Sequence, residues 1–235
     1  MAEPLVQVNN LYKYYGHKKA LDNVSLCLES GRIIGLLGPN GSGKTTLIKI
    51  LNGLLQPSGG EVLISGNRPG VITKTEVSYL PDRPYFADWM RVKDMLNLFR
   101  DFYWDFDYAR AENLCKALDI SPNAKIKTLS KGMKEKVQLI LVMSRSAKLY
   151  LLDEPIAGVD PAARELILDT ILSNYNPEST IIISTHLIGD IERILDEAIF
   201  LRDGQVLLHD STEAICERSG KSVDSLFRDM FRATW

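Results

Sequence analysis

The stretch Gly38–Thr46 has the residue types and the spacing to hold the phosphates of a nucleotide. It reads GPNGSGKTT and fits the pattern G-x-x-x-x-G-K-[ST], with Gly38, Gly43, Lys44 and Thr45 at the fixed positions. Glycines let the backbone curl around phosphate oxygens without a Cβ in the way, so that backbone N–H groups can bind them. Lys44 is expected to reach the β- and γ-phosphates, and the Thr45 hydroxyl to ligate Mg²⁺. The stretch therefore predicts a nucleotide site rather than a plain glycine-rich turn.

Two carboxylates follow an apolar run, as nucleoside triphosphate hydrolysis requires. The run 149–152 is continuous, which is typical of a strand buried on both faces of a parallel sheet, and Asp153 and Glu154 come next. Asp153 could hold the Mg²⁺ shell, and Glu154 could polarise the attacking water. His186 follows another apolar run, and strands of one parallel sheet end on the same edge. We therefore predict that these three side chains share an edge with the phosphates.

Strands and helices that alternate along the chain are needed to place these residues. An apolar run at 33–37 precedes the glycine-rich stretch, and a helical run at 45–54 follows it. The pattern predicts further strands at 5–8, 24–28, 61–64, 77–80, 180–183, 198–201 and, after the Asp203-Gly204 turn, 205–209. It predicts further helices at 162–172, 187–195, 212–218 and 223–231, the first opened by Asp160 as N-cap and Pro161. This alternation is typical of an α/β fold.

Residues 88–146 are expected to form a helical subdomain inserted in the α/β core. Apolar residues recur at helical spacing between 92 and 99 and again between 111 and 118, and Ser130 is a good N-cap for a further helix. Nine aromatic residues fall between Tyr85 and Tyr108. They form either a small core of this subdomain or an exposed docking surface for a partner, since aromatic residues are enriched at interface cores.

Composition excludes several classes of protein. Apolar content of 45% and charged content of 25% are typical of a soluble globular chain, and 235 residues suffice for one large α/β domain. The net charge of -2 gives no whole-molecule argument for nucleic acid, so no nucleic-acid partner is expected. Cys27, Cys115 and Cys216 are far apart, which argues against a disulfide framework or zinc site and fits a reducing cytosol. We expect neither a secretory signal nor a membrane span.

The order of motifs resembles that of the nucleotide-binding domain of ATP-binding cassette (ABC) proteins along nearly the whole chain. The stretches KYYG, GPNGSGKTT, YLPD, LSKGM, LYLLDEP, AGVD and STH match the family's A-loop, Walker A, Q-loop, signature, Walker B, D-loop and H-loop in order. The resemblance implies a P-loop NTPase core with a mostly parallel sheet, an N-terminal antiparallel β subdomain and an inserted α-helical subdomain. Residues 1–235 would then be a single ABC domain, with the core and β subdomain at 1–87 and 147–235.

The resemblance also implies roles for individual residues. In this family two domains pair head to tail and sandwich two ATP molecules. Glu154 would be the catalytic base, His186 would contact the γ-phosphate, and Asp160 would lie at the seam between the copies. The signature residues Ser130, Lys131 and Gly132 would complete the ATP site of the facing copy. The ATP-binding set would be Tyr15, Gly38, Pro39, Asn40, Gly41, Ser42, Gly43, Lys44, Thr45 and Thr46, with Tyr15 stacked on adenine, and Thr45, Asp82 and Asp153 would hold Mg²⁺.

Two positions depart from the family's pattern. The usual Q-loop glutamine is Asp82, whose carboxylate can still bind Mg²⁺ but is shorter and charged. The signature keeps only the second of its usual two glycines, as Lys131-Gly132. Lys131 either adds positive charge near phosphate or points to solvent, and burial statistics for lysine favour solvent.

The first hypothesis for function is the ATPase subunit of an exporter that resembles ABC-2-type drug and antibiotic efflux systems. Its partners would be a second ABC ATPase subunit, identical or different, and integral membrane permease subunits. The protein would be cytoplasmic, bound to the inner face of the cell membrane. The alternative is an ABC ATPase that drives conformational change in a non-transport assembly, as in iron–sulfur cluster scaffolds. A P-loop small-molecule kinase would have no use for LSKGM and AGVD together.

Overall fold

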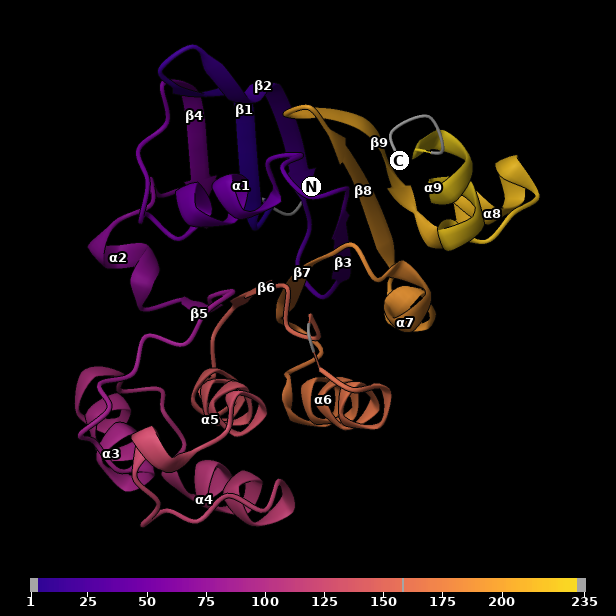
Figure 1. Ribbon diagram of the computed structural model, residues 1–235. Coiled ribbons are helices and arrows are strands. Elements are labelled where there is room, and N and C mark those ends of the chain that lie inside the picture. Colours follow the sequence, from indigo (N-terminus) through magenta and orange to yellow (C-terminus); the bar gives the residue numbers. More distant parts are fainter. Residues whose placement is uncertain (1–3, 158, 232–235) are drawn as a thin grey trace.

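A six-stranded sheet forms the centre of the molecule (Figure 1). The computed structural model describes residues 4–157 and 159–231. The strands lie in the order β5-β6-β7-β3-β8-β9, and all pairs are parallel except that of β8 with β9. Their bounds are Ile33–Leu37 (β3), Val77–Leu80 (β5), Leu149–Asp153 (β6), Thr180–Thr185 (β7), Glu197–Arg202 (β8) and Gln205–Ser211 (β9). The α/β class and the mostly parallel sheet are therefore confirmed.

Both faces of this sheet are covered, as the continuous apolar strands predict. Figure 1 shows α1 (Lys44–Leu51) and a second sheet above it, and α5 (Lys131–Met143) and α6 (Pro161–Asn174) below it. Side chains of β3 alternate between two cores: Ile34 and Leu36 pack on the α1 side, whereas Ile33 and Leu37 pack on the α5 side. The glycine-rich stretch leaves β3 between these two cores.

The second sheet corrects one expectation from the sequence. Its strands β1 (Val6–Tyr15), β2 (Lys18–Leu28) and β4 (Gly59–Ile64) are antiparallel, as expected, but β1 and β2 form one long hairpin. The sequence predicted strands only at 5–8 and 24–28, with a polar loop between them. The polar residues of the expected loop instead lie on the two strands, whose buried positions there include Leu11 and Leu21. Tyr15 consequently lies at the end of β1 and not within a long loop.

The segment between β5 and β6 is helical. Its elements are α3 (Val92–Phe102), α4 (Tyr108–Ala117), a 3₁₀ turn (Ile126–Thr128) and α5; a short helix that the sequence did not predict, α2 (Val71–Lys74), precedes β5. Ser130 is the N-cap of α5, and its side chain accepts a hydrogen bond from the Met133 N–H. The predicted start of this helix is confirmed.

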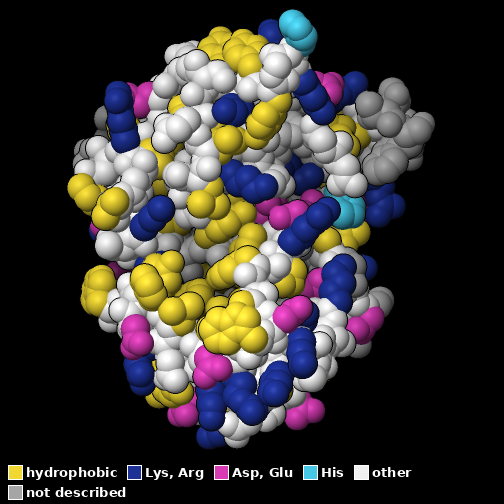
Figure 2. Space-filling model, turned by 60° about the vertical axis from the view of Figure 1, so that its left-hand side comes forward, with side chains coloured by type: hydrophobic (Ala, Val, Ile, Leu, Met, Phe, Trp, Pro, Cys, Tyr) yellow, Lys and Arg dark blue, Asp and Glu magenta, His cyan; other side chains and the backbone are white. Residues whose placement is uncertain are grey.

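The nine aromatic residues of this segment differ in burial, and Phe86, Tyr103 and Tyr108 are partly buried against the core. The small-core interpretation therefore holds for part of the set, and the docking surface stays a prediction. Phe99 and Phe106 are buried, with ring centroids 5.8 Å apart, and belong to the core that continues under the main sheet. Four others are between 56% and 85% exposed, namely Tyr85, Trp89, Phe102 and Trp104. Figure 2 shows hydrophobic side chains gathered across the middle of this face of the molecule.

Arg145 ties this helical segment to the edge of the main sheet. Its guanidinium and the Asp105 carboxylate are each only 2% exposed and pair through two hydrogen bonds of 3.1 and 3.2 Å. The same guanidinium donates to the Val77 carbonyl of β5 at 2.5 Å and stacks over the Tyr103 ring. The C-terminal end of α5 is thereby fixed to β5 and to the loop that joins α3 to α4.

The last third of the chain ends in two helices, α8 (Thr212–Ser219) and α9 (Val223–Phe231). The helix predicted at 187–195 is wrong in length, because α7 (Ile188–Ile191) gives way to a 3₁₀ turn at Glu192–Ile194. After this turn the chain enters β8. The Glu192 side chain accepts a hydrogen bond from the Asp224 N–H, which lies at the start of α9. Among the described helices, none combines the length and the apolar character that a membrane crossing needs.

Candidate functional site

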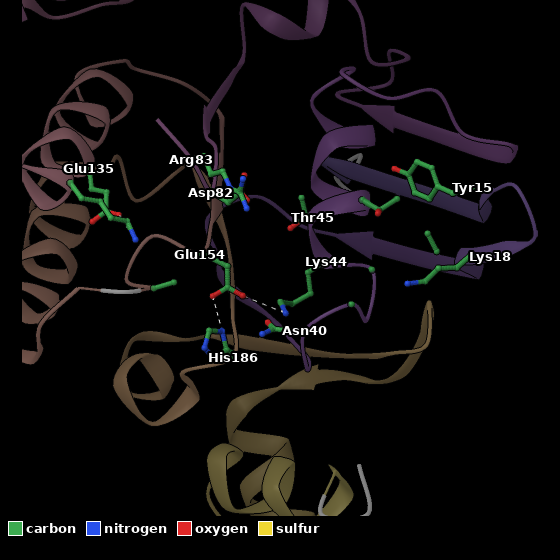
Figure 3. A pocket seen from close by; sticks show the side chains of 16 residues that line it. Tyr15, Lys18, Asn40, Lys44, Thr45, Asp82, Arg83, Glu135, Glu154 and His186 are labelled. Atoms are coloured by element: carbon green, nitrogen blue, oxygen red, sulfur yellow. Dashed lines mark hydrogen bonds and ion pairs between the residues drawn. The ribbon is translucent and has the colours of Figure 1, made fainter. Parts of the chain in front are cut away.

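The carboxyl ends of three strands converge at one cavity of about 680 Å³ (Figure 3). The glycine-rich stretch follows β3, Asp153 is the last residue of β6 with Glu154 directly after it, and His186 follows β7. Lys44, Glu154 and His186 all line the cavity. The predicted convergence of these residues at one sheet edge is therefore what the structure shows.

Glycine is required at two positions of the glycine-rich stretch. Gly43 has φ +113°, in the left-handed region, and a Cβ there would lie 2.5 Å from the Ala20 carbonyl oxygen. A Cβ on Gly38 would lie 2.3 Å from the Leu201 carbonyl oxygen. Any residue with a Cβ at Gly38 or Gly43 would therefore force the backbone of this turn to change.

Lys44 lies at the first position of α1 and is almost fully buried. Its ammonium group donates hydrogen bonds to the carbonyl oxygens of Gly38 at 2.7 Å and Pro39 at 3.2 Å, and lies 3.5 Å from Glu154 Oε1. Burial lowers the pKa of Lys44 from its ordinary value, and the neighbouring Glu154 carboxylate partly opposes that shift. The ammonium group is thus held by the same loop that forms the phosphate turn.

Asp153 is fully buried, and one of its two oxygens is already occupied. Its Oδ1 accepts hydrogen bonds from Ser184 Oγ at 2.6 Å and from Thr45 Oγ1 at 3.1 Å. Its Oδ2 is buried and has no hydrogen-bond partner within the described part of the chain. Burial raises the pKa of Asp153; the two hydrogen bonds oppose this shift, and the Asp82 charge adds to it.

These oxygens fit a hard divalent cation. The free Oδ2 of Asp153 and the Thr45 hydroxyl bonded to the same carboxylate are oxygen ligands of the kind that Mg²⁺ prefers. Asp82 lines the cavity as well, with a side chain that is 42% exposed. The site can hold such a cation beside a phosphate bound to the glycine-rich turn.

Glu154 and His186 form a pair across neighbouring strands. His186 Nδ1 lies 3.0 Å from Glu154 Oε2, as the dashed line in Figure 3 marks. The Glu154 backbone adopts φ +52°, which is unusual for a residue with a side chain. Its N–H donates to the carbonyl and the hydroxyl of Ser184, and these two bonds hold the backbone in place.

The N-terminal end of α5 borders the same cavity from the opposite side. Lys131 lines it, is 74% exposed, and pairs with Glu135 at 3.7 Å. Ser130 and Gly132 are exposed but do not line the cavity, and a Cβ on Gly132 would have no neighbour within 4 Å. The structure thus places the signature stretch at the surface.

The other predicted residues differ in their relation to the cavity. It is lined by Tyr15, Asn40, Gly41, Gly43, Thr45 and Thr46, but not by Gly38, Pro39, Ser42 or Asp153. Asp160 is exposed near the start of α6, and Gly158 of the AGVD stretch lies outside the described residues.

Sequence reasoning missed several residues of this site. Lys18 and Ala20 line the cavity beside Tyr15, and Arg83 and Glu135 border it elsewhere. Only Glu135 had a usable signal, since it stands four residues after Lys131 and such pairs meet on one helix face. Ser184, near the end of β7, donates a hydrogen bond to Asp153. The only sequence signal for this residue was that it is polar and follows an apolar run.

The model of the family described as "ABC transporter" matches residues 21–157, which is more than half of the chain. The chain belongs to the ABC transporter family. An uncharacterised ABC transporter ATP-binding protein of Methanocaldococcus jannaschii is 34% identical over 92% of this chain and 81% of its own length. The SkfA peptide export ATP-binding protein of Bacillus subtilis is 31% identical, over 86% of this chain and 87% of its own. The daunorubicin resistance ATP-binding protein DrrA3 of Streptomyces coeruleorubidus is 27% identical over 97% of this chain and 75% of its own length.

Comparison with solved structures agrees. A structure described as the ATP-binding subunit of an ABC transporter superposes with a TM-score of 0.86 and 28% identity, covering 96% of this chain and 98% of that one. This member of the ABC transporter family is therefore an ATP-binding cassette that hydrolyses ATP, and its fold is the P-loop NTPase fold with the two predicted additions. The relatives are transporter subunits, and they do not favour the alternative of a non-transport scaffold.

Proposed function

We propose that this cassette powers an exporter through membrane-spanning subunits on separate chains. The observation that carries the proposal is the meeting of Lys44, Asp153, Glu154 and His186 at one sheet edge, with Lys44 and His186 both contacting Glu154. This arrangement supplies a phosphate ligand, a cation ligand and a general base in one place.

ATP binding rearranges the resting contacts of Lys44. Phosphate oxygens replace the carbonyls of Gly38 and Pro39 as acceptors for the ammonium group, and the backbone N–H groups of Asn40–Thr46 and the dipole of α1 add positive charge. The Ser42 hydroxyl is buried without a partner in the described residues and is available as a further donor. The Tyr15 ring is half exposed at the edge of the cavity and offers a face on which adenine can stack. The Lys13 ammonium group lies over this ring, 5.4 Å from its centroid.

Thr45, Asp153 and Asp82 are the residues that would hold Mg²⁺. When bound, Mg²⁺ neutralises charge that develops on the β- and γ-phosphates. Glu154 is the general base: its carboxylate takes a proton from the attacking water after ATP has drawn Lys44 away. His186, hydrogen-bonded to Glu154 Oε2, orients this carboxylate and lies within the cavity where the γ-phosphate would be.

A second cassette completes the site. The exposed start of α5 supports this part of the proposal, because the space around Gly132 lets a phosphate approach the backbone closely. Ser130, Lys131 and Gly132 would serve the ATP of the facing copy, and Asp160 would lie at the seam. If the two copies are identical, symmetry makes the interface self-complementary and gives two equivalent sites.

The membrane subunit would bind in a groove next to the ATP cavity. This groove of about 460 Å³ lies between α1 and the helical segment and is lined by Leu54, Tyr79, Tyr85, Phe99 and Tyr103 among others. Asp82 and Arg83 line both the groove and the ATP cavity. Residues 88–146 would then move as a subdomain relative to the core and carry the groove's far wall.

Two relatives support the assignment to an exporter. One carries "peptide export" in its name and another "daunorubicin resistance". The cassette would accordingly work at the cytoplasmic face of the cell membrane, held there by its permease.

The decisive experiment is an affinity purification of tagged Glu154→Gln protein from native membranes with Mg²⁺ and ATP, analysed by mass spectrometry. A multi-spanning membrane protein in stoichiometric amount is the expected result, because the slowed hydrolysis keeps the ATP-bound assembly together. Recovery with soluble proteins alone would refute the export function and return the scaffold alternative.

A further inference from the structure

The hydroxyl of Tyr79 is buried and has no hydrogen-bond partner in the described part of the chain. Only three other buried side-chain polar atoms there share this property, and one of them is Asp153 Oδ2. A buried hydroxyl without a partner is destabilising, so its presence calls for an explanation.

Tyr79 and Asp153 lie on the same face of the main sheet. In the parallel pairing of β5 with β6, Tyr79 stands opposite Leu151, and Asp153 follows two residues later on the same strand. Because side chains alternate along a strand, Leu151 and Asp153 share a face, which is the face that packs on α1. Diagonal neighbours on adjacent strands are within reach of an aromatic side chain. The two unpaired oxygens therefore belong to side chains on the same face of the sheet. Tyr79 lines the groove beside the ATP cavity, and Asp82 lines both the groove and the cavity.

Asp82 lies three residues after Tyr79, and its carboxylate is poorly held. Its one ion pair in the described residues is with the adjacent Arg83 at 3.8 Å, and the Arg83 side chain is almost fully exposed. Such an exposed pair contributes little and does not fix a carboxylate in one orientation. A cation ligand at this position needs a second contact to be directed inward.

We propose that Tyr79 is a positioning residue of the metal site, whose hydroxyl donates a hydrogen bond to the Asp82 carboxylate and turns it toward Asp153. This inference rests on the proposed binding of Mg²⁺ by Thr45, Asp82 and Asp153. A tyrosine hydroxyl is protonated at neutral pH and can donate this hydrogen bond.

The test measures how much a metal tightens nucleotide binding. Titration calorimetry gives the dissociation constant of the non-hydrolysable analogue AMP-PNP in EDTA and again in Mn²⁺, and the ratio of the two reports the metal's contribution. Tyr79→Phe should leave the value in EDTA unchanged and weaken binding in Mn²⁺ about three- to tenfold, the size of one net hydrogen bond. Tyr85→Phe, which removes a hydroxyl from an exposed groove tyrosine, should change neither value.

A double-mutant cycle with Asp82→Ala, which removes the acceptor, distinguishes positioning from a general packing effect. If Tyr79 acts through Asp82, adding Tyr79→Phe to Asp82→Ala should cause a clearly smaller loss in Mn²⁺ than in the wild type. An equal loss in both backgrounds, or no loss in Tyr79→Phe alone, would overturn the inference and leave the proposed function intact. A wild-type protein that does not bind AMP-PNP would instead refute the proposed function itself. Tyr79→Phe should unfold no earlier than the wild type, because it removes an unpaired buried oxygen.

Discussion

Lys44 Nζ lies 3.5 Å from Glu154 Oε1, so the candidate phosphate ligand and the candidate general base form an ion pair. The pair is mostly buried, and each partner has a further bond: Lys44 to the carbonyls of its own loop, and Glu154 to His186. Phosphates that bind Lys44 would have to separate the two, so the proposed base would stay paired with Lys44 until a nucleotide binds.

Substitution of the base should separate binding from turnover. Glu154→Gln removes the carboxylate that competes for Lys44, so ATP should bind at least as tightly as to the wild type. Phosphate release should fall by about 10²- to 10⁴-fold, the usual contribution of a general base. Equilibrium binding and single-turnover phosphate release measure the two effects. Glu61→Gln, at an exposed carboxylate paired with Arg68, should retain wild-type rates. Unchanged turnover in Glu154→Gln would contradict the assignment.

The buried Asp153 should make the stability of the nucleotide-free protein depend on pH. Its pKa is raised in the folded chain above the ordinary value of 3.8, so its carboxyl stabilises the fold most when protonated. As pH rises from about 3.8 through the raised pKa, this contribution is lost. The free energy of unfolding of the wild type minus that of Asp153→Asn should therefore decrease as pH rises through this window. Denaturant titrations at several pH values measure the difference, and a slope of the opposite sign would exclude a raised pKa.

The Arg145–Asp105 pair should contribute strongly to stability, because both charges are buried. Arg145→Met leaves the Asp105 carboxylate without its partner and should cost about 3–5 kcal/mol in the free energy of unfolding. Arg68→Met breaks the exposed pair with Glu61 and should cost less than about 1 kcal/mol. Urea denaturation of both variants provides the comparison. Equal losses would show that burial does not determine the strength of these pairs.

The exposed aromatic residues should matter for assembly and not for folding. Tyr85→Ala or Trp89→Ala should weaken association with the membrane partner and leave the melting temperature and nucleotide binding unchanged, because both side chains are exposed. Phe99→Ala should instead destabilise the chain by about 3–5 kcal/mol, because Phe99 belongs to the core. Co-purification with the permease and thermal unfolding give the two readouts. Loss of folding in Tyr85→Ala would assign that residue to the core.

Local sequence signals predicted the parts of the fold that depend on local physics. The strand Val77–Leu80 and the Ser130 N-cap follow from a short apolar run and from one hydroxyl before an apolar helix. The long β1–β2 hairpin was underestimated, because one face of it is exposed and its polar residues mask the alternation. The pairing of Arg145 with Asp105 joins residues 40 positions apart, and no local pattern encodes it. The same holds for Ser184 and Asp153, which only the parallel register brings together.

The two ends of α5 differ in how firmly they are held. Its C-terminal end is fixed to β5 through Arg145, while its first residue, Lys131, faces the open cavity. The helix has 13 residues, hence a length of about 20 Å. A tilt of about 10° around the anchored end displaces the other end by about 3 Å, which is roughly the length of one hydrogen bond. A tilt of this size about the Arg145 end would be enough to make or break a contact at Ser130.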